Sequence, residues 1–559
     1  MNLKTSLLLA SILVFPMSSR GQQGTVSPED LLKPLSHSWP TYNGDYTAKR
    51  YSALTSINKM TVKNLSLGWM SQLTPGTDAT SSSGRGRREQ VPLSIGGEGE
   101  GNINIRSGSI KGSVLAVDGV LYVTMPDNAW AVDARDGHQL WHYYWKTRGG
   151  THIGNRGFGM WHGYLFMETP DNYLVSLDAK TGKERWHKTI ADLDQGYFST
   201  PAPIIIGNHV LVGTGNDIDA PGFLQSFDPE TGDLQWKFYT VPMKKGDPGA
   251  DTWANLDAAS HGGGQTWITG AYDPETKLYV FGTGNPTPAY TTGKRGDGDN
   301  LFTCALVALN VDTGKMAWYY STSPHDMHDY DSAQTPVFVN GMFKGRMRKL
   351  VLTAARNGYF FVLDRVTGEH LLTSKYGATT NWAKGYTPKG APQHDPEKDA
   401  TIAGSLDSPN SSGTINWQPV TFSPRTGLLY VYETDTFSLT YLTDPDPRGS
   451  MGLGGKEETT VGSAGSYLTA IDYKTGQARW RHKFHGNAIG GGGLLATAGG
   501  LVFSGDGSGN LVAYDEVNGK PLWHTRIGQV SNAPQTYMLD GHQYLICATG
   551  DMLWSFLLY

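Results

Sequence analysis

An eleven-residue pattern that ends in tryptophan recurs along the chain and constrains its fold more than any other feature. In residues 176–186, Ser-Leu-Asp ends one strand, Ala-Lys-Thr-Gly forms a turn, and Glu-Arg-Trp begins the returning strand. A glycine in this turn adopts a positive φ without steric cost, so the pattern predicts a β-hairpin with a large apolar anchor. Further complete copies are residues 131–141, 226–236, 308–318, 470–480 and 513–523.

The number of anchors predicts the number of structural units. Leu372 stands where tryptophan is expected in a seventh copy, and Trp69 resembles the end of an eighth. The most closely spaced anchors are 45, 50 and 43 residues apart (141 to 186, 186 to 236, 480 to 523), which is the length of a four-stranded propeller blade. The wider gaps, 236 to 318 and 372 to 480, then hold long inserted loops.

We therefore predict an all-β fold, an eight-bladed β-propeller that forms a single domain over residues 23–559. The alternative is a β-solenoid or a series of separate β-domains. Solenoid coils are shorter than this repeat, and separate domains would not share one repeat.

The first residues of the chain differ from the rest in composition. Lys4 precedes an apolar run, residues 7–15, and the small residues Ser18 and Ser19 follow. This composition is typical of a secretory signal peptide, which is too short to span a bilayer. We predict a signal peptide over residues 1–22, no membrane span and a periplasmic location.

The charge of the chain argues against two classes of partner. The signal peptide contains Lys4 and Arg20, so its removal lowers the basic residues from 46 to 44 against 51 acidic ones, a net charge of −7 (44 − 51). Such a balance offers no basic face to nucleic acid and no polybasic run to a membrane surface.

The chain has two cysteines, Cys304 and Cys547, both in apolar runs that are typical of strands. We predict two buried thiols. The attachment motif of c-type haem, Cys-x-x-Cys-His, is absent, and this predicts that the protein has no haem. Electrons taken from a substrate would then leave to a separate partner.

Polar residues gather at three places where predicted strands end. The strongest cluster, residues 323–331, holds three carboxylates and two imidazoles. On an extended backbone Asp329 and Asp331 point the same way, and two like charges so close favour a cation between them. Asn285, in Gly-Thr-Gly-Asn, and residues 213–219, Gly-Thr-Gly-Asn-Asp-Ile-Asp, add oxygen donors for a hard cation. The alternative for the first cluster is a solvated acidic loop.

With these motifs the chain resembles the quinoprotein alcohol dehydrogenases, eight-bladed propellers that bind pyrroloquinoline quinone (PQQ) and a metal ion on the central axis. The resemblance extends from Trp39-Pro-Thr-Tyr-Asn-Gly to the final strand, and the repeated tryptophans match the family's blade-docking motif. In that family a Trp-Asp-Tyr-Asp-like motif carries the catalytic base. The resemblance places His328-Asp-Tyr-Asp331 there and implies that Asp329 is the base.

The resemblance also implies the metal ligands. Asn285 matches the family's Asn, Asp329 matches the base that also binds the metal, and Asp217 is the gapless match to a carboxylate that is usually the longer Glu. Asp219 remains an alternative to Asp217. An Asp at the position of Asp331 accompanies lanthanide use in the family, so the implied ion is Ca²⁺ or a lanthanide.

The quinone contacts carry over from the family in the same way. They comprise an arginine for a quinone carboxylate, hydroxyl and small residues at the same edge, an indole beneath the ring, a cation at the reactive oxygens and an amide at the far side. The matching residues are Arg156, Thr169, Thr214, Gly215, Trp267, Arg356 and Asn416. The adjacent cysteines that cover the quinone in many members are absent, and Thr151 or His152 stands in their place. Lys111 stands near a position where the family often has Glu.

The implied activity is the oxidation of a primary or secondary alcohol to the carbonyl. Asp329 would take the hydroxyl proton as hydride leaves the carbon, while the metal and Arg356 polarise the quinone. The electrons would pass to a separate acceptor, a c-type cytochrome or a similar protein. Two alternatives remain: a PQQ-dependent sugar or aldehyde dehydrogenase, and a non-catalytic propeller scaffold, which should lack the axial residues named above.

Overall fold

The computed structural model describes residues 25–76, 94–332, 334–443, 455–485 and 491–559. The predicted signal peptide, residues 1–22, lies outside this part of the chain. Strands dominate the described residues. The helical elements are short: α1 (Leu256–Ser260), η1 (Asp30–Leu32), η2 (Val62–Asn64), η3 (Leu193–Gln195), η4 (Ala250–Thr252) and η5 (Pro396–Lys398).

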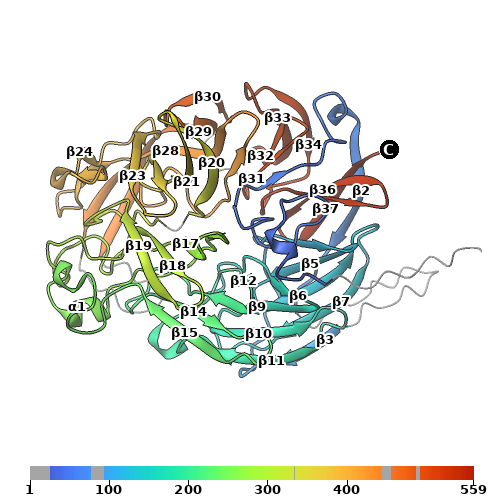
Figure 1. Ribbon diagram of the computed structural model, residues 1–559, viewed down its shortest axis with the longest axis horizontal. Helices are drawn as coiled ribbons and strands as arrows, with labels where there is room; N and C mark the ends of the chain where they lie inside the picture. The colour runs from blue at the N-terminus through green and yellow to red at the C-terminus, as the bar shows by residue number, and fades with distance from the viewer. Residues whose placement is uncertain (1–24, 77–93, 333, 444–454, 486–490) are drawn as a thin grey trace, which may run out of the picture.

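Within the described residues, eight sheets of four or five strands surround a common centre (Figure 1). Four of them, each given from edge to edge, are β3 (Ser94–Glu98), β7 (Gln139–Trp145), β6 (Asn128–Asp133), β5 (Val120–Met125), β4 (Leu115–Val117); β11 (Glu184–Thr189), β10 (Tyr173–Asp178), β9 (Tyr164–Glu168), β8 (Gly159–Trp161); β12 (Ile204–Ile206), β13 (His209–Val212), β14 (Phe223–Phe227), β15 (Leu234–Tyr239); and β16 (Ala271–Asp273), β17 (Leu278–Gly282), β18 (Ala305–Asn310), β19 (Lys315–Ser321).

The other four sheets continue the ring. They are β20 (Val337–Phe343), β21 (Arg346–Ala354), β22 (Tyr359–Asp364), β23 (His370–Lys375); β26 (Ser405–Asp407), β28 (Leu428–Leu442), β29 (Lys456–Asp472), β30 (Ala478–Lys483), with β27 (Thr421–Ser423) also paired to β28; β1 (Tyr51–Ser52), β31 (Leu494–Thr497), β32 (Leu501–Gly505), β33 (Asn510–Asp515), β34 (Pro521–Arg526); and β2 (Leu65–Gln72), β37 (Met552–Leu558), β36 (His542–Thr549), β35 (Gln535–Leu539). A separate two-stranded sheet pairs β24 (Ala383–Tyr386) with β25 (Pro392–His394).

The position of a strand within its sheet explains its composition. The inner strands β12 and β13 are buried along their whole length and are almost entirely apolar. The outer strands β15 and β30 alternate between more and less exposed residues. A strand covered on both faces needs apolar side chains throughout, whereas an outer strand turns one face to water.

The repeated tryptophans join neighbouring sheets. The indole N–H of Trp141, in β7, donates to the carbonyl of Ala179, in the turn of the next sheet, at 3.0 Å. A Cβ on Gly182, in the same turn with a φ of 69°, would collide with the Trp141 ring, so only glycine lets the ring lie on the turn. The same pair of contacts recurs at Trp69, Trp186, Trp236, Trp318 and Trp480.

Segments from the two ends of the described chain lie together. Strand β2 pairs with β37, with Leu65 opposite Leu558, so one sheet combines an early strand with three late ones, blue beside red in Figure 1. The carbonyls of residues 46–49 accept N–H bonds from three inner strands, at Tyr272, Phe338 and Phe422.

The wide gaps between anchors hold insertions, as predicted. Elements η4 and α1 lie between Trp236 and Trp318. Between Leu372 and Trp480 lie the β24–β25 sheet and the extended strands β28 and β29, which are 15 and 17 residues long.

The loops that carry the predicted metal ligands and Arg356 lie at one end of the ring of sheets. The segments after β13, β17 and β21 and the segment before β20 share this end because neighbouring strands are antiparallel. Cys304 and Cys547 are buried and not paired in a disulfide, as predicted. No helix in the described part of the chain is long and apolar enough to cross a membrane.

Candidate active site

A cavity of about 190 Å³ lies where these loops meet. Six of the predicted site residues line it: Arg156, Asp217, Trp267, Asp331, Arg356 and Asn416. Its wall also includes Lys111, Phe198, Asn216 and Trp417. The fold therefore brings residues from distant parts of the sequence to one hollow.

One wall of the cavity is cationic and aromatic. The Arg156 guanidinium carbon lies 4.9 Å from the ring centroid of Trp267, and Trp417 packs against Trp267. Burial lowers the pKa of Arg156 to about 10. Arg156 Nε and Trp267 Nε1 are buried and have no hydrogen-bond partner. Unpaired buried donors are costly, so this wall fits a planar ligand that carries carboxylates.

Three predicted quinone residues are not among those that line the cavity. The Thr169 hydroxyl donates to Asp171 Oδ1 at 2.6 Å, and the Thr214 hydroxyl donates to Gln265 Oε1 at 2.7 Å. At Gly215 a Cβ would collide with the ring of Phe198, which does line the cavity. These hydroxyls already have partners within the protein.

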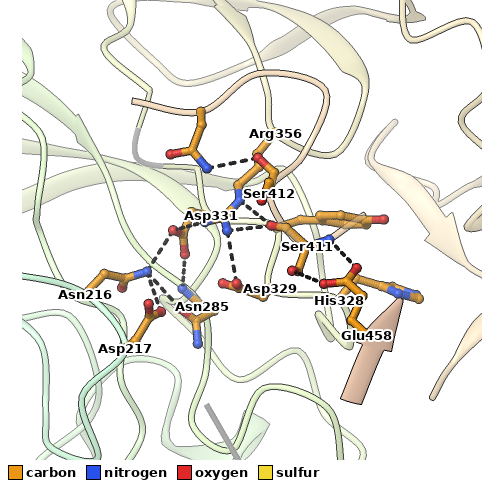
Figure 2. Close-up of polar contacts among 12 residues, drawn as sticks. Asn216, Asp217, Asn285, His328, Asp329, Asp331, Arg356, Ser411, Ser412 and Glu458 are labelled. Carbon is orange, nitrogen blue, oxygen red and sulfur yellow. Dashed lines mark hydrogen bonds and ion pairs between the residues drawn. The ribbon is translucent and has the colours of Figure 1, made fainter. Parts of the chain in front are cut away.

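The predicted base Asp329 and the predicted metal ligand Asn285 are not among the residues that line the cavity, but Asp329 contacts Arg356, which does line it. Arg356 lies between two acids: its Nη1 is 2.5 Å from Asp331 Oδ2 and its Nη2 is 3.0 Å from Asp329 Oδ2 (Figure 2). Asp329 is 3% exposed, and its Oδ1 has no partner. Tyr290 Oη is 3.5 Å from Asp329 Oδ2.

The remaining predicted metal ligands adjoin these acids. The Asn285 backbone N–H donates to Asp331 Oδ1 at 2.6 Å. Asn216 Nδ2 lies 2.9 Å from Asp217 Oδ1, 3.0 Å from Asn285 Oδ1 and 2.8 Å from Asp331 Oδ2. We refer to Asp217, Asn285, Asp329 and Asp331 as the axial cluster.

The geometry separates Asp217 from its rival Asp219. Asp217 lines the cavity, whereas Asp219 is not among the lining residues and has an oxygen 3.4 Å from His261 Nδ1. No group of three or more His, Cys, Asp or Glu among the described residues is arranged to hold a metal. Within the axial cluster, Asn216 and Arg356 stand between the carboxylates.

Burial favours the protonated, neutral form of these carboxylates when no cation is bound. Burial and the charge of Asp331 raise the pKa of Asp217 to about 7. Burial raises the pKa of Asp329 well above its ordinary value, although Arg356 opposes this effect. Burial likewise raises the pKa of Asp331. A cation at this place would favour the charged forms, so the oxygen donors of the axial cluster fit a hard metal ion.

Two members of the axial cluster have an unusual backbone. Asp217 and Asp329 have φ values of 61° and 65°. Non-glycine residues adopt this left-handed conformation rarely, and Asp does so more readily than most. Both carboxylates therefore come from tight loops, which direct them differently from side chains on a strand.

Hydrogen bonds hold the loops around the base. Asp326 accepts the backbone N–H of Asp329 at 2.8 Å. Glu458, in β29, accepts from Ser411 N at 2.9 Å and from Ser411 Oγ at 2.5 Å. The Ser411 carbonyl in turn accepts from Arg356 Nε at 2.8 Å. Figure 2 shows this connection from Glu458 to Arg356.

The segment that replaces the missing cysteines lines the cavity with other residues than expected. Ile153 and Gly154 form part of the wall, and Thr151 and His152 do not. His152 Nε2 lies 2.6 Å from Asp127 Oδ2 instead. Lys111 Nζ donates to the carbonyl of Ile153 at 2.6 Å.

Sequence reasoning missed two kinds of residue here. Asn216 lies between Gly215 and Asp217, so its place beside a predicted ligand was an available signal. Ser411 and Glu458, the latter in β29, lie far from Arg356 in the sequence, and no motif indicated that they would contribute to the site.

Comparisons with known proteins bear on the family. The family model for the β-propeller domain of glucose/ethanol/alcohol dehydrogenase (PQQ) matches residues 39–379, and a model for the outer membrane protein assembly factor BamB matches residues 464–555. The chain is 31% identical to a quinohemoprotein alcohol dehydrogenase of Comamonas testosteroni, over 92% of this chain and 72% of the relative. It is also 31% identical to quinoprotein alcohol dehydrogenase PedH of Pseudomonas putida, over 98% of this chain and 91% of the relative.

A solved structure shows the same fold. A europium-containing methanol dehydrogenase superposes with a TM-score of 0.79 at 25% identity, covering 95% of this chain and 99% of the other. The predicted all-β propeller is confirmed.

The prediction of no haem is contradicted by these comparisons. Three relatives, from Comamonas testosteroni and Pseudomonas putida, are named quinohemoproteins. The prediction rested on a missing attachment motif in these 559 residues, whereas the chain covers 72–73% of the lengths of relatives with such names. A motif search within the shared part has no bearing on the rest of those proteins.

The predicted PQQ family is confirmed by the match over residues 39–379 and by relatives above 30% identity along most of the chain. This chain belongs to the PQQ-dependent alcohol dehydrogenases and is an oxidoreductase that acts on alcohols.

Proposed function

We propose that this protein oxidises primary or secondary alcohols in the periplasm, with PQQ and one metal ion bound at the cavity. The observation that carries this proposal is that Arg156, Trp267 and Arg356 line one cavity together with two members of the axial cluster, Asp217 and Asp331. Arg356 also contacts Asp329, which lies next to this cavity. Cationic and aromatic side chains in the same cavity as a group of acids form the arrangement that an anionic planar cofactor and a hard cation require.

We propose that each of the eight large sheets is one blade of a single propeller domain, residues 23–559. The tryptophan contacts between neighbouring sheets support this assignment. Removal of residues 1–22 as a signal peptide would deliver the protein to the periplasm.

The quinone residues divide into two groups. Arg156, Trp267, Arg356 and Asn416 line the cavity, so they are the stronger candidates for direct contact. Thr169, Thr214 and Gly215 would support the residues that line the cavity. Alternatively, the two hydroxyls would exchange their present hydrogen-bond partners for the cofactor.

The cation would be held by Asp217, Asn285, Asp329 and Asp331 and would be Ca²⁺ or a lanthanide. When bound, the quinone accepts two electrons from the alcohol and the cation polarises it. Every donor in this set is a carboxylate or amide oxygen, which suits both ions.

Asp329 would act as the base. Its Oδ1 is buried and has no partner, which leaves it available to accept the hydroxyl proton of an alcohol. Arg356 orients Oδ2 and opposes the rise in the pKa of Asp329, and Asp326 fixes the loop by accepting its N–H. The low exposure of Asp329 would keep bulk water from competing for this oxygen.

The electrons would leave this chain for a separate acceptor, a c-type cytochrome. Some relatives are named as the dehydrogenase subunit of alcohol dehydrogenase (quinone), which supports an acceptor on another chain. A sugar is the second candidate substrate, because the matching family description includes glucose.

Reconstitution tests the proposal. Purified protein would be incubated with PQQ plus Ca²⁺ or La³⁺, and dye reduction measured with primary alcohols, secondary alcohols, aldehydes and glucose. We expect turnover with alcohols that requires both quinone and metal. Turnover with glucose alone would replace alcohol by sugar, and no quinone binding would reject the cofactor.

A further inference from the structure

One amide nitrogen lies among three members of the axial cluster. Asn216 Nδ2 lies within 3.0 Å of an oxygen on each of Asp217, Asn285 and Asp331 (Figure 2). A side-chain amide has only two N–H hydrogens, so it cannot donate fully to three acceptors. Three oxygens from three separate loops thus converge on an atom that satisfies them incompletely.

The other end of the same amide is also poorly satisfied. Asn216 Oδ1 is buried and has no hydrogen-bond partner. It lies against Gly284, where any Cβ would collide with it. A buried carbonyl oxygen without a donor is costly, so nothing within the described residues favours this orientation at its oxygen end.

Rotation about the Cβ–Cγ bond exchanges the two ends. The nitrogen and oxygen of an amide are nearly equal in size, so this rotation needs no repacking. It would turn Oδ1 toward the three oxygens that Nδ2 now faces. Several oxygens around one point form a coordination site for a hard cation.

We propose that Asn216 is itself a ligand of the cation that the proposed function requires. Without a cation its amide nitrogen faces the three oxygens. With a cation the amide turns, and Oδ1 becomes an additional neutral ligand. This compensates for the short reach of Asp217, because Ca²⁺ and similar ions take six to eight oxygens.

Cation binding to quinone-free protein tests the role of Asn216 without measuring activity. Tb³⁺ would be titrated by luminescence and Ca²⁺ by calorimetry into the parent, Asn216→Ala, Asn216→Asp and a control, Asn357→Ala. Asn357 is also buried, but its side chain donates to Thr322 and Ser323 instead of to the axial cluster.

We expect Asn216→Ala to weaken Tb³⁺ binding by about 10- to 100-fold, the range seen when a group that supports a metal site is removed. The luminescence lifetime in H₂O and D₂O should report about one more bound water, which replaces the lost oxygen. Asn357→Ala should leave the affinity within about twofold of the parent, because the Asn357 amide donates to Thr322 and Ser323 and not to the axial cluster.

Asn216→Asp gives a second, opposite signature. The added charge should strengthen Tb³⁺ binding and lower the melting temperature of the metal-free protein, because it brings another carboxylate to buried acids. A residue with a merely structural role would not move these two quantities in opposite directions. If Asn216→Ala does not fold, Asn216→Asp still tests whether Asn216 is a ligand of the cation.

Three results would overturn the inference. Unchanged Tb³⁺ affinity in Asn216→Ala would remove Asn216 from the ligands while leaving the proposed function intact. Equal losses in Asn216→Ala and Asn357→Ala would show a general effect on folding. No cation binding by the parent protein would reject the metal of the proposed function, and this inference with it.

Discussion

Two groups of buried acids lie beside an arginine in this protein, and their surroundings differ. The axial cluster adjoins Arg356 at the cavity. Glu433 and Asp435 lie two residues apart in β28, where Arg481 Nε donates to Glu433 Oε2 at 2.9 Å. Both acids in β28 are fully buried, and each has one oxygen without a partner. Asp329 and Asp331 of the axial cluster are also buried, so both groups combine buried carboxylates with one arginine.

The backbone and the packing separate them. Glu433 and Asp435 stay in register within the sheet, opposite Tyr467 and Gly465. The axial acids come from loops, two of them with positive φ, and two of them line a cavity. Burial raises the pKa of both Glu433 and Asp217 to about 7, so a raised pKa does not distinguish a site from a structural pair. The axial cluster differs because two of its carboxylates line a cavity that a ligand can enter.

The largest expected effect separates the two groups by activity. Asp329→Ala should lower alcohol turnover by about 10² to 10⁴ in reconstituted protein, because it removes the base and a metal ligand. Glu433→Gln should leave turnover near that of the parent. Steady-state assays at saturating quinone and metal measure both. Substantial turnover by Asp329→Ala would reject its role as base.

The second effect concerns the cationic wall of the cavity. Arg156→Ala should weaken quinone binding by about tenfold or more, because a ligand carboxylate would lose its charged partner. Arg481→Ala, which removes the arginine beside Glu433, should leave quinone affinity unchanged. Equilibrium titration of quinone-free protein measures this difference. Equal quinone affinities in the parent and in Arg156→Ala would contradict a contact between Arg156 and a quinone carboxylate.

The third effect concerns the choice of metal. Asp331→Ala should reduce activity with La³⁺ more than activity with Ca²⁺, by roughly tenfold in ratio, because a trivalent ion gains more from each carboxylate. The variant also frees Arg356 from its 2.5 Å contact, so Asp331→Asn serves as the matched variant that keeps a hydrogen-bonding group. An unchanged ratio in both variants would contradict a role of Asp331 in metal choice.

The smallest effect is a pH dependence of stability. Burial, reinforced by Asp435, raises the pKa of Glu433 from 4.5 to about 7, so the folded protein holds this proton more tightly than the unfolded one. The resulting stabilisation is complete below the unfolded pKa and is lost as the pH rises through the folded pKa. Glu433→Gln should therefore reduce, by a few degrees, the fall in melting temperature between about pH 5 and about pH 8. An unchanged fall would show that Glu433 does not titrate in this range.

The sequence located the sheets well because the signal is local. A turn glycine and its tryptophan are four residues apart, as in Gly182 and Trp186, and the six complete copies carry both. The residues of the cavity wall, such as Arg156 and Trp267, were found through resemblance, since their meeting depends on blades far apart in sequence.

Other features of the site depend on the orientation of side chains and of backbone carbonyls, which sequence motifs do not predict. The hydroxyls of Thr169 and Thr214 turn to Asp171 and Gln265, and no spacing rule distinguishes this from a turn toward a ligand. Glu458 is connected to Arg356 through Ser411, whose backbone carbonyl accepts from Arg356, and no sequence motif indicates a contact made by a backbone carbonyl.

The pairing of β2 with β37 has a consequence for how the chain acquires its fold. Leu65 meets Leu558, so the last sheet cannot form until nearly the whole chain is available. Contacts of such large sequence separation carry a high loop-closure cost and slow folding. Until then β36 and β2 each have an unpaired edge, which invites association with other chains. A chain that crosses a membrane from its N-terminus would thus emerge with its ring open and would close it only when the final strand arrived.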